Sequence, residues 1–291
     1  MTAILMRGGS MLISIFKRVY QSGFLVLGIV GVFACQNNQK ENPLTSNGNT
    51  AVAKDTLSYS MDSLRILSPY IASHEDQMDT SYAEVIYPKF EDSSLNQLVD
   101  QTILLEGEPD IKTYVNNFIE GYGNFVEENN LNYPIAWTKS TKVGLILNTP
   151  RLICIKNGTY EYSGGAHGNF FENLSVFDIE NNRKLELNAF ISDNKMKEFT
   201  KIAENIFRTK EGLSDTSSLA NGYFFENGNF SLAANYGITK DGFLFHYNPY
   251  EIKPYAEGTT SIVIPYAQVE DMLTQKGKLY IDNLKAYFHS I

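Results

Sequence analysis

The spacing of apolar residues alternates along the chain between helical and strand periods. Apolar returns three and four residues apart predict a helix just after Ser94, a second from residue 109 to about 129, and a third over residues 195–209. Alternation with a period of two predicts strands at residues 82–90, 141–147, 151–155, 174–179, 185–187, 223–226, 230–234, 242–247 and 260–264. These elements predict an α+β fold, with mostly antiparallel sheets and a few packed helices.

Three shorter features refine this pattern. We expect residues 148–150 to form the turn between two adjacent strands, because Asn, Thr and Pro follow one apolar run and precede the next. Asn157-Gly158 is a dipeptide typical of hairpin turns, so we expect a bend there. Pro265 precedes apolar residues at helical spacing, which predicts a short helix over residues 265–273.

The N-terminal segment is typical of an export signal. Residues 24–34 are apolar, follow several basic residues, and end directly before Cys35. The apolar run is shorter than the about 20 residues that span a bilayer, so we predict a signal peptide over residues 1–34. The segment also resembles the lipobox of bacterial lipoproteins, in which the cysteine is acylated. That resemblance implies lipidation at Cys35 and an envelope location, at the outer membrane if the cell is diderm. An ordinary secretory signal and a retained membrane helix are the alternatives.

Composition narrows the classes of partner. Residues 35–58 are polar and rich in Asn and Ser, which predicts a flexible tether. The whole chain has 24 basic and 33 acidic residues, for a net charge of −9. Such an acidic chain repels phosphates, so we expect no nucleic-acid partner. Cys154 lies in an apolar run and is expected to be a small buried side chain rather than a reactive thiol.

Residues 162–168 are the strongest candidate for a functional loop. The segment Gly164-Gly165-Ala166-His167-Gly168 combines three glycines with one of four histidines, which allows close approach of backbone or ligand. His167 has three interpretations: a general base, a hydrogen-bonded histidine in a tight loop, or a contact to a partner. No second histidine is placed for metal binding, so we expect no metal and no cofactor. Whether His167, Asp178 and Glu251 converge would separate these interpretations.

Several motifs follow this loop in a fixed order, at residues 177–179, 185–187, 243–258 and 262–266. The order over residues 80–275 resembles the DUF3298 family of extracytoplasmic proteins with a preceding DUF4163-like region. The segment Tyr-Glu-Ile-Lys-Pro-Tyr-Ala-Glu-Gly, at residues 250–258, is its most specific part. Members of this family include the lysozyme-binding domain of the sigma-V anti-sigma factor and the non-catalytic part of a peptidoglycan deacetylase.

The resemblance implies a division of the chain and a function. We expect a DUF4163-like region over residues 59–170, a DUF3298-like domain over residues 171–275 and a C-terminal tail over residues 276–291. The implied function is non-catalytic binding of a lysozyme-like protein or of peptidoglycan at the cell envelope, with no catalytic residue. The candidate binding residues are Gly164, Gly165, His167, Tyr250, Glu251 and Tyr255. The alternatives are a wall-acting hydrolase or deacetylase that uses His167, and a structural lipoprotein.

Overall fold

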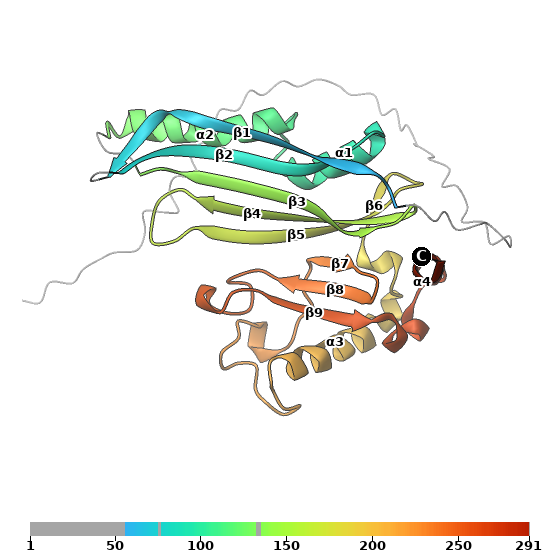
Figure 1. Cartoon of the computed structure of the whole chain (residues 1–291). Coiled ribbons are helices and arrows are strands. Elements are labelled where there is room, and N and C mark those ends of the chain that lie inside the picture. The colour runs from blue at the N-terminus through green and yellow to red at the C-terminus, as the bar shows by residue number, and fades with distance from the viewer. Residues whose placement is uncertain (1–55, 75–76, 132–134, 291) are drawn as a thin grey trace, which may run out of the picture. The chain divides into compact units, whose positions relative to one another are not determined.

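The computed structural model describes residues 56–74, 77–131 and 135–290 (Figure 1). The predicted signal peptide, Cys35 and nearly all of the predicted tether lie outside these residues. The described part belongs to one compact unit. Its strands form a six-stranded sheet in the order β1-β2-β3-β4-β5-β6 and a three-stranded sheet in the order β7-β8-β9. The expected α+β class with mostly antiparallel sheets is therefore confirmed.

The larger sheet consists of long strands: β1 (Tyr59–His74), β2 (Gln77–Phe90), β3 (Thr138–Asn148), β4 (Leu152–Tyr162), β5 (Asn169–Asp178) and β6 (Arg183–Leu185). The smaller sheet consists of β7 (Tyr236–Ile238), β8 (Gly242–Tyr247) and β9 (Thr260–Pro265). Only β2 and β3 pair in parallel among these strands. Parallel neighbours need a long crossover, which α1 (Ser93–Ile103) and α2 (Ile111–Glu128) supply.

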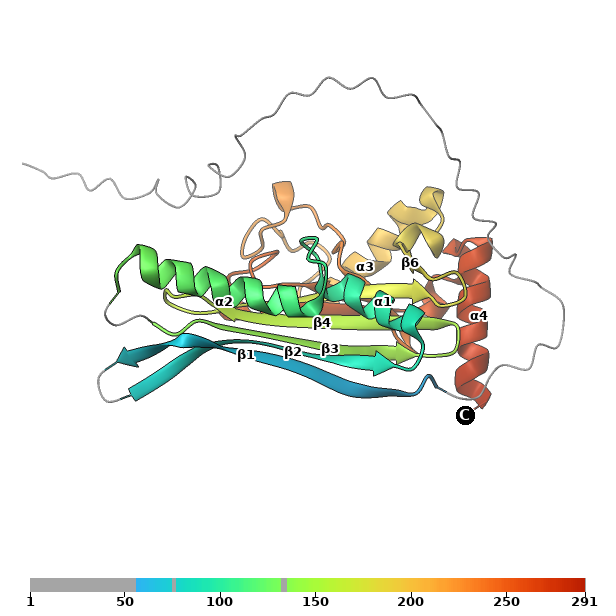
Figure 2. The same ribbon diagram turned by 90° about the horizontal axis from the view of Figure 1, so that it is seen from above.

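The elements stack in layers (Figures 1 and 2). Helices α1 and α2 cover one face of the larger sheet. The core between these helices and the sheet includes Leu98, Val115 and Ile155. The smaller sheet packs on the opposite face, where Gly237 of β7 lies against Cys154 of β4. Helix α3 (Met196–Lys210) covers the far side of the smaller sheet. Each amphipathic element thus buries its apolar face against a neighbouring layer.

The chain ends in a helix, α4 (Gln275–Ser290), where the sequence suggested a tail. Tyr280, Ile281, Leu284 and Tyr287 of α4 are buried. The hydroxyl of Tyr280 donates to the carboxylate of Asp178 at the end of β5. Residues 276–291 are therefore part of the packed structure up to Ser290.

Several local predictions are wrong. Asn157-Gly158 does not bend, because both residues pair with β3 on one side and β5 on the other. Residues 223–226 and 230–234 form no strand, because their aromatic rings pack into the core from irregular backbone, whereas β7 follows at residues 236–238. Residues 265–273 form two 3₁₀ turns rather than one helix. The first helix is capped by Asp92, whose side chain accepts from the Ser94 amide, and not by Ser94 itself.

The strand predicted at residues 185–187 shares only Leu185 with β6, because Leu187 begins a 3₁₀ turn. The remaining predicted elements are confirmed, with shifted ends. Helix α2 begins after Asp110, whose carboxylate accepts from the Thr113 amide, and α3 covers the predicted helix at residues 195–209. The predicted turn at residues 148–150 joins β3 to β4. The expected domain boundary between residues 170 and 171 falls inside β5, which pairs with β4 on both sides of that position.

Candidate functional site

The glycine-rich loop connects β4 to β5 at one end of the larger sheet. Gly164 and Gly165 have φ values of 98° and 99°, which a side chain would strain. The Tyr162 hydroxyl donates to the Gly165 carbonyl oxygen over 3.2 Å and closes the turn. The two candidate glycines therefore shape the loop.

His167 is exposed and stacks on an aromatic ring from another loop. Its ring centroid lies 4.0 Å from that of Tyr255, at an interplanar angle of 15°. Nδ1 lies 3.0 Å from the Gly168 carbonyl oxygen, and Nε2 lies 3.4 Å from the Tyr250 hydroxyl. The Tyr255 hydroxyl donates to the same Gly168 oxygen over 2.7 Å. We call His167, Tyr250 and Tyr255 the aromatic cluster.

The loop between β8 and β9 presents the two tyrosines. Tyr250 has a φ of 67°, which is unusual for a side-chain-bearing residue. Its side chain is 56% exposed. The Glu251 carboxylate accepts from the Asn248 amide over 2.8 Å, and the Asn248 side chain bonds to the backbone N–H and C=O of Glu172 in β5. These bonds fix the strained turn against the larger sheet.

The carboxylates that could assist His167 do not converge on it. Asp178 is fully buried and binds Asn181 and Tyr280. It occupies the opposite end of the 10-residue strand β5, about 30 Å from the loop at the usual strand rise. Glu251 instead accepts a hydrogen bond from the Asn248 backbone amide. The structure therefore unites three of the six candidate binding residues, His167, Tyr250 and Tyr255, in one aromatic surface.

The structure also bears on Cys154, on metal binding and on membrane-spanning helices. Cys154 is fully buried, and burial raises the pKa of its thiol to about 12, which fits a packing role. Within the described ranges, no three His, Cys, Asp or Glu side chains group as metal ligands. No helix among these same residues is both long and apolar enough to cross a bilayer.

A hollow of about 300 Å³ adjoins the aromatic cluster on the larger sheet. Residues of three adjacent strands line it: Ser140, Lys142, Lys156, Gly158, Tyr160, Phe170 and Glu172. A side chain at Gly168 would lie 2.4 Å from the Tyr160 hydroxyl, so Tyr160 packs directly on the loop that carries His167. Tyr160 therefore connects the hollow to the loop that carries His167.

Ionisable groups border this hollow. Lys156 Nζ lies 2.8 Å from Glu172 Oε1, and His246 Nε2 lies 3.6 Å from Glu172 Oε2. His246 Nδ1 is within 2.7 Å of the Ser261 hydroxyl. Burial lowers the pKa of His246 from its usual value, against the opposing attraction of Glu172.

The lowered pKa of His246 predicts a pH-dependent stability. The unfolded chain binds the proton of this residue more readily than the folded chain, so His246 stabilises the fold above the ordinary histidine pKa of about 6.5 and loses that contribution as the pH falls. Between about pH 7.5 and pH 5.5, the wild type should therefore lose more thermal stability than His246→Gln. Melting curves at both pH values measure this difference. An equal loss in the two proteins would contradict the prediction.

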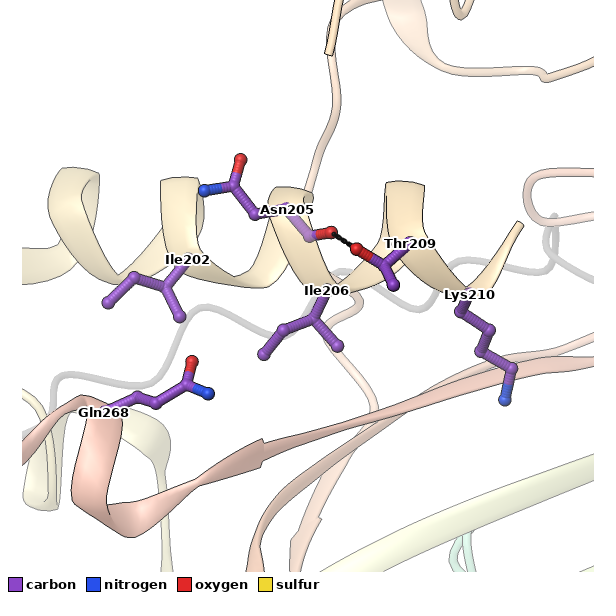
Figure 3. Close-up of a pocket in the computed structure, with 6 residues that line it drawn as sticks. All are labelled: Ile202, Asn205, Ile206, Thr209, Lys210 and Gln268. Carbon is purple, nitrogen blue, oxygen red and sulfur yellow. Dashed lines mark hydrogen bonds between the residues drawn. The ribbon is translucent and has the colours of Figure 1, made fainter. Parts of the chain in front are cut away.

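Two further hollows are lined by other elements of the fold. One, of about 420 Å³, runs along α3, where Ile202 and Ile206 face Gln268 (Figure 3). Two of its polar side chains are already engaged, since Thr209 donates to the Asn205 carbonyl and Lys210 donates to the Ser261 carbonyl. The other, of about 600 Å³, lies between β1, β2 and the crossover helices.

Sequence reasoning missed the hollow beside the aromatic cluster. Its signal was present as alternate positions on two strands, at residues 156, 158 and 160 and at residues 170 and 172. Alternation assigns each set to one face of its own strand. It does not tell which residues of neighbouring strands lie side by side. The pairing register of β3, β4 and β5 decides this, and it brings the lining residues together.

Comparison with known proteins agrees with the expected resemblance. Residues 188–267 match the family model DUF3298, described as a protein of unknown function, and residues 74–170 match the model Deacetylase PdaC. The resemblance to DUF3298 is confirmed over the first of these ranges. No curated protein matches the chain.

Two solved structures share the fold. A DUF3298 family member from Bacteroides fragilis is 24% identical, with a TM-score of 0.65, over 80% of this chain and 100% of its own. A DUF3298 family protein from Pseudomonas aeruginosa is 17% identical, with a TM-score of 0.61, over 77% of this chain and 97% of its own. At these identities the likeness concerns the fold.

Proposed function

We propose that the chain is a lipid-anchored protein of the cell envelope whose domain binds a lysozyme-like protein or peptidoglycan without catalysis. The apolar segment before Cys35 supports the anchor, and labelled-palmitate incorporation that is lost in Cys35→Ser would test it. The matches to the DUF3298 and Deacetylase PdaC models support an envelope-related domain.

The aromatic cluster is the observation that carries the binding proposal. His167 and Tyr255 stack in parallel, and the Tyr250 and Tyr255 ring centroids are 5.5 Å apart. Hydrogen bonds fix both loops, so little conformational entropy remains to be lost when a partner binds. Flat rings with polar edges suit the apolar faces and hydroxyl groups of sugars, and equally the surface of a protein.

The contacts of the nearby ionisable groups favour binding over catalysis. A general base needs an open nitrogen and a partner that orients it. His167 directs its two nitrogens at a backbone carbonyl and a tyrosine hydroxyl, while Asp178 and Glu251 are engaged elsewhere. Neither Asp178 nor Glu251 therefore assists His167, and the contacts of its ring hold it in the stack with Tyr255.

Sedimentation of the full chain with insoluble peptidoglycan, and its capture on immobilised lysozyme, test the proposed function. We expect binding to at least one of them, weakened about tenfold or more by His167→Ala or Tyr250→Ala, because exposed aromatic anchors dominate such interfaces. Tyr59→Ala is the matched control, since this ring is 45% exposed on the edge strand β1. Absence of binding to both partners would refute the proposal, and so would turnover of peptidoglycan that His167→Ala abolishes.

A further inference from the structure

We infer that the hollow beside the aromatic cluster binds one sugar unit that carries a carboxylate. This inference rests on the proposed function and specifies the chemistry of the ligand. It starts from two rows of residues that cross the three strands in register. Ser140, Tyr160 and Phe170 form one row, and Lys142, Gly158 and Glu172 form the next.

The first row supplies the apolar surface. Tyr160 and Phe170 lie opposite each other on β4 and β5 and remain 40% and 37% exposed. Exposed rings in adjacent positions are costly to hydrate and are typical of sites that stack on a ligand. Ser140 at the end of the row donates to Glu84 Oε1 over 3.4 Å, and its hydroxyl oxygen can still accept a hydrogen bond. Such a row matches the apolar face and hydroxyl edge of a pyranose ring.

The second row has a gap at its centre. Gly158 lies between Lys142 and Glu172, whose backbones are two strand spacings apart, about 10 Å. Within a sheet, glycine weakens a strand and often marks a place where a ligand approaches closely. A Cβ at this position would be in ordinary contact, 3.6 Å from Glu172 Oε1, so the fold does not require a glycine there. The Phe170 ring lies 3.7 Å from the same point, so Glu172 and Phe170 border the space that a larger side chain at this position would fill.

Charge determines the kind of sugar. Lys156 pairs with Glu172 and neutralises it. Lys142 is exposed and forms no ion pair with any residue in the described ranges. The hollow therefore keeps one uncompensated ammonium group, although the chain as a whole carries a net charge of −9. An ammonium group next to aromatic rings suits a ligand that is apolar on one face and anionic at one edge.

The size and position of the hollow agree with a single unit of a longer glycan. Its volume of about 300 Å³ is at the lower limit of protein ligand sites. Tyr160 contacts Gly168, whose carbonyl oxygen accepts from Tyr255, so a glycan that leaves the hollow at this side meets the aromatic cluster. In this arrangement Lys142 binds the carboxylate, while Tyr160 and Phe170 stack on the ring.

Three soluble glycans test this inference on the full chain by calorimetry. One is a tetrasaccharide of alternating N-acetylglucosamine and N-acetylmuramic acid, whose carboxylate is a lactyl substituent. The second is a tetragalacturonate, whose carboxylate is part of the ring, and the third is the neutral chitotetraose. We expect at least one acidic glycan to bind about tenfold or more tightly than chitotetraose, because a charge-assisted contact is added. The stronger of the two identifies the source as wall glycan or as polyuronate.

Two variants assign the binding to the hollow. Lys142→Gln should weaken the acidic glycan about tenfold and leave chitotetraose unchanged, whereas Lys201→Gln on the exposed face of α3 should change neither. Gly158→Val should abolish binding of the acidic glycan, because its methyl groups fill the centre of the second row. Valine is favoured in strands, so thermal melting of this variant should show no loss of stability.

Failure of this inference differs from failure of the proposed function. If the chain sediments with peptidoglycan but binds acidic glycans no better than chitotetraose, the inference is refuted and the proposed function stands. Binding of the acidic glycan that survives both Lys142→Gln and Gly158→Val would also refute it. If the chain binds neither peptidoglycan nor lysozyme, the proposed function itself has failed.

Discussion

Phe207→Ala lowers the free energy of unfolding by about 3–5 kcal/mol, as expected for truncation of a fully buried phenylalanine. The Phe207 ring is completely buried, and its centroid lies 5.3 Å from that of Tyr223, 5.5 Å from that of Phe225 and 5.3 Å from that of Phe230. Alanine leaves a cavity that these rings close only in part, because the Tyr223 hydroxyl is held by Glu211 over 3.0 Å and Phe225 packs against Phe230. Urea denaturation followed by circular dichroism measures the change.

Phe224→Ala is the matched control for this substitution. Phe224 lies in the same irregular segment but is 55% exposed, so its truncation should change the stability by less than about 0.5 kcal/mol. A loss below about 1 kcal/mol in Phe207→Ala would contradict the central position of this ring in the core. Similar losses in the two variants would show that the segment is held by something other than the rings around Phe207.

The same segment shows where sequence patterns mislead. Residues 223–226 and 230–234 are rich in aromatic side chains, which favour strands. Positive φ values at Gly222, Asn227 and Gly228 break the extended backbone, and the rings enter the core one by one. Strand β7, at residues 236–238, is too short to stand out as a period-two pattern. Local preference was outweighed here by packing against α3.

The C-terminal helix shows the opposite case. Tyr280, Ile281, Leu284 and Tyr287 have helical spacing and are buried, so the sequence does contain α4. The expectation of a tail followed from the end of the family motifs. Long periodic elements such as α2 and α3 were predictable, because each buries a whole apolar stripe in a single layer contact.

The candidate site was predictable only where its residues are close together in the sequence. The loop glycines and His167 are neighbours in sequence, and the specific segment at residues 250–258 supplied Tyr250 and Tyr255. The stacking of His167 on Tyr255 joins residues 88 positions apart through two layers, and no local pattern encodes it. The isolation of Asp178 likewise follows from its place at the far end of β5, where it meets Tyr280.

Gly277→Ala should lower the free energy of unfolding by about 1–3 kcal/mol or more, because the first turn of α4 approaches the backbone of Phe190 too closely for a methyl group. A Cβ at Gly277 would lie 2.4 Å from the Phe190 carbonyl oxygen and 2.6 Å from its Cα atom. Relaxation is limited, since that oxygen accepts from the Thr274 amide over 2.8 Å and the Thr274 hydroxyl accepts from the Gly277 amide over 2.8 Å. The backbone itself must therefore move.

Gly121→Ala on α2 gives the opposite sign and serves as the control. No atom lies within 4 Å of a Cβ at Gly121, so alanine only restricts the unfolded chain and should stabilise the protein by about 0.5–1 kcal/mol. Both substitutions remove a helical glycine, and only the environment of the added methyl group differs. Thermal and urea melts of the two variants compare them directly. Equal stability of Gly277→Ala and Gly121→Ala would contradict the close contact between α4 and Phe190. The position of α4 that allows Tyr280 to bond to Asp178 would then be in question as well.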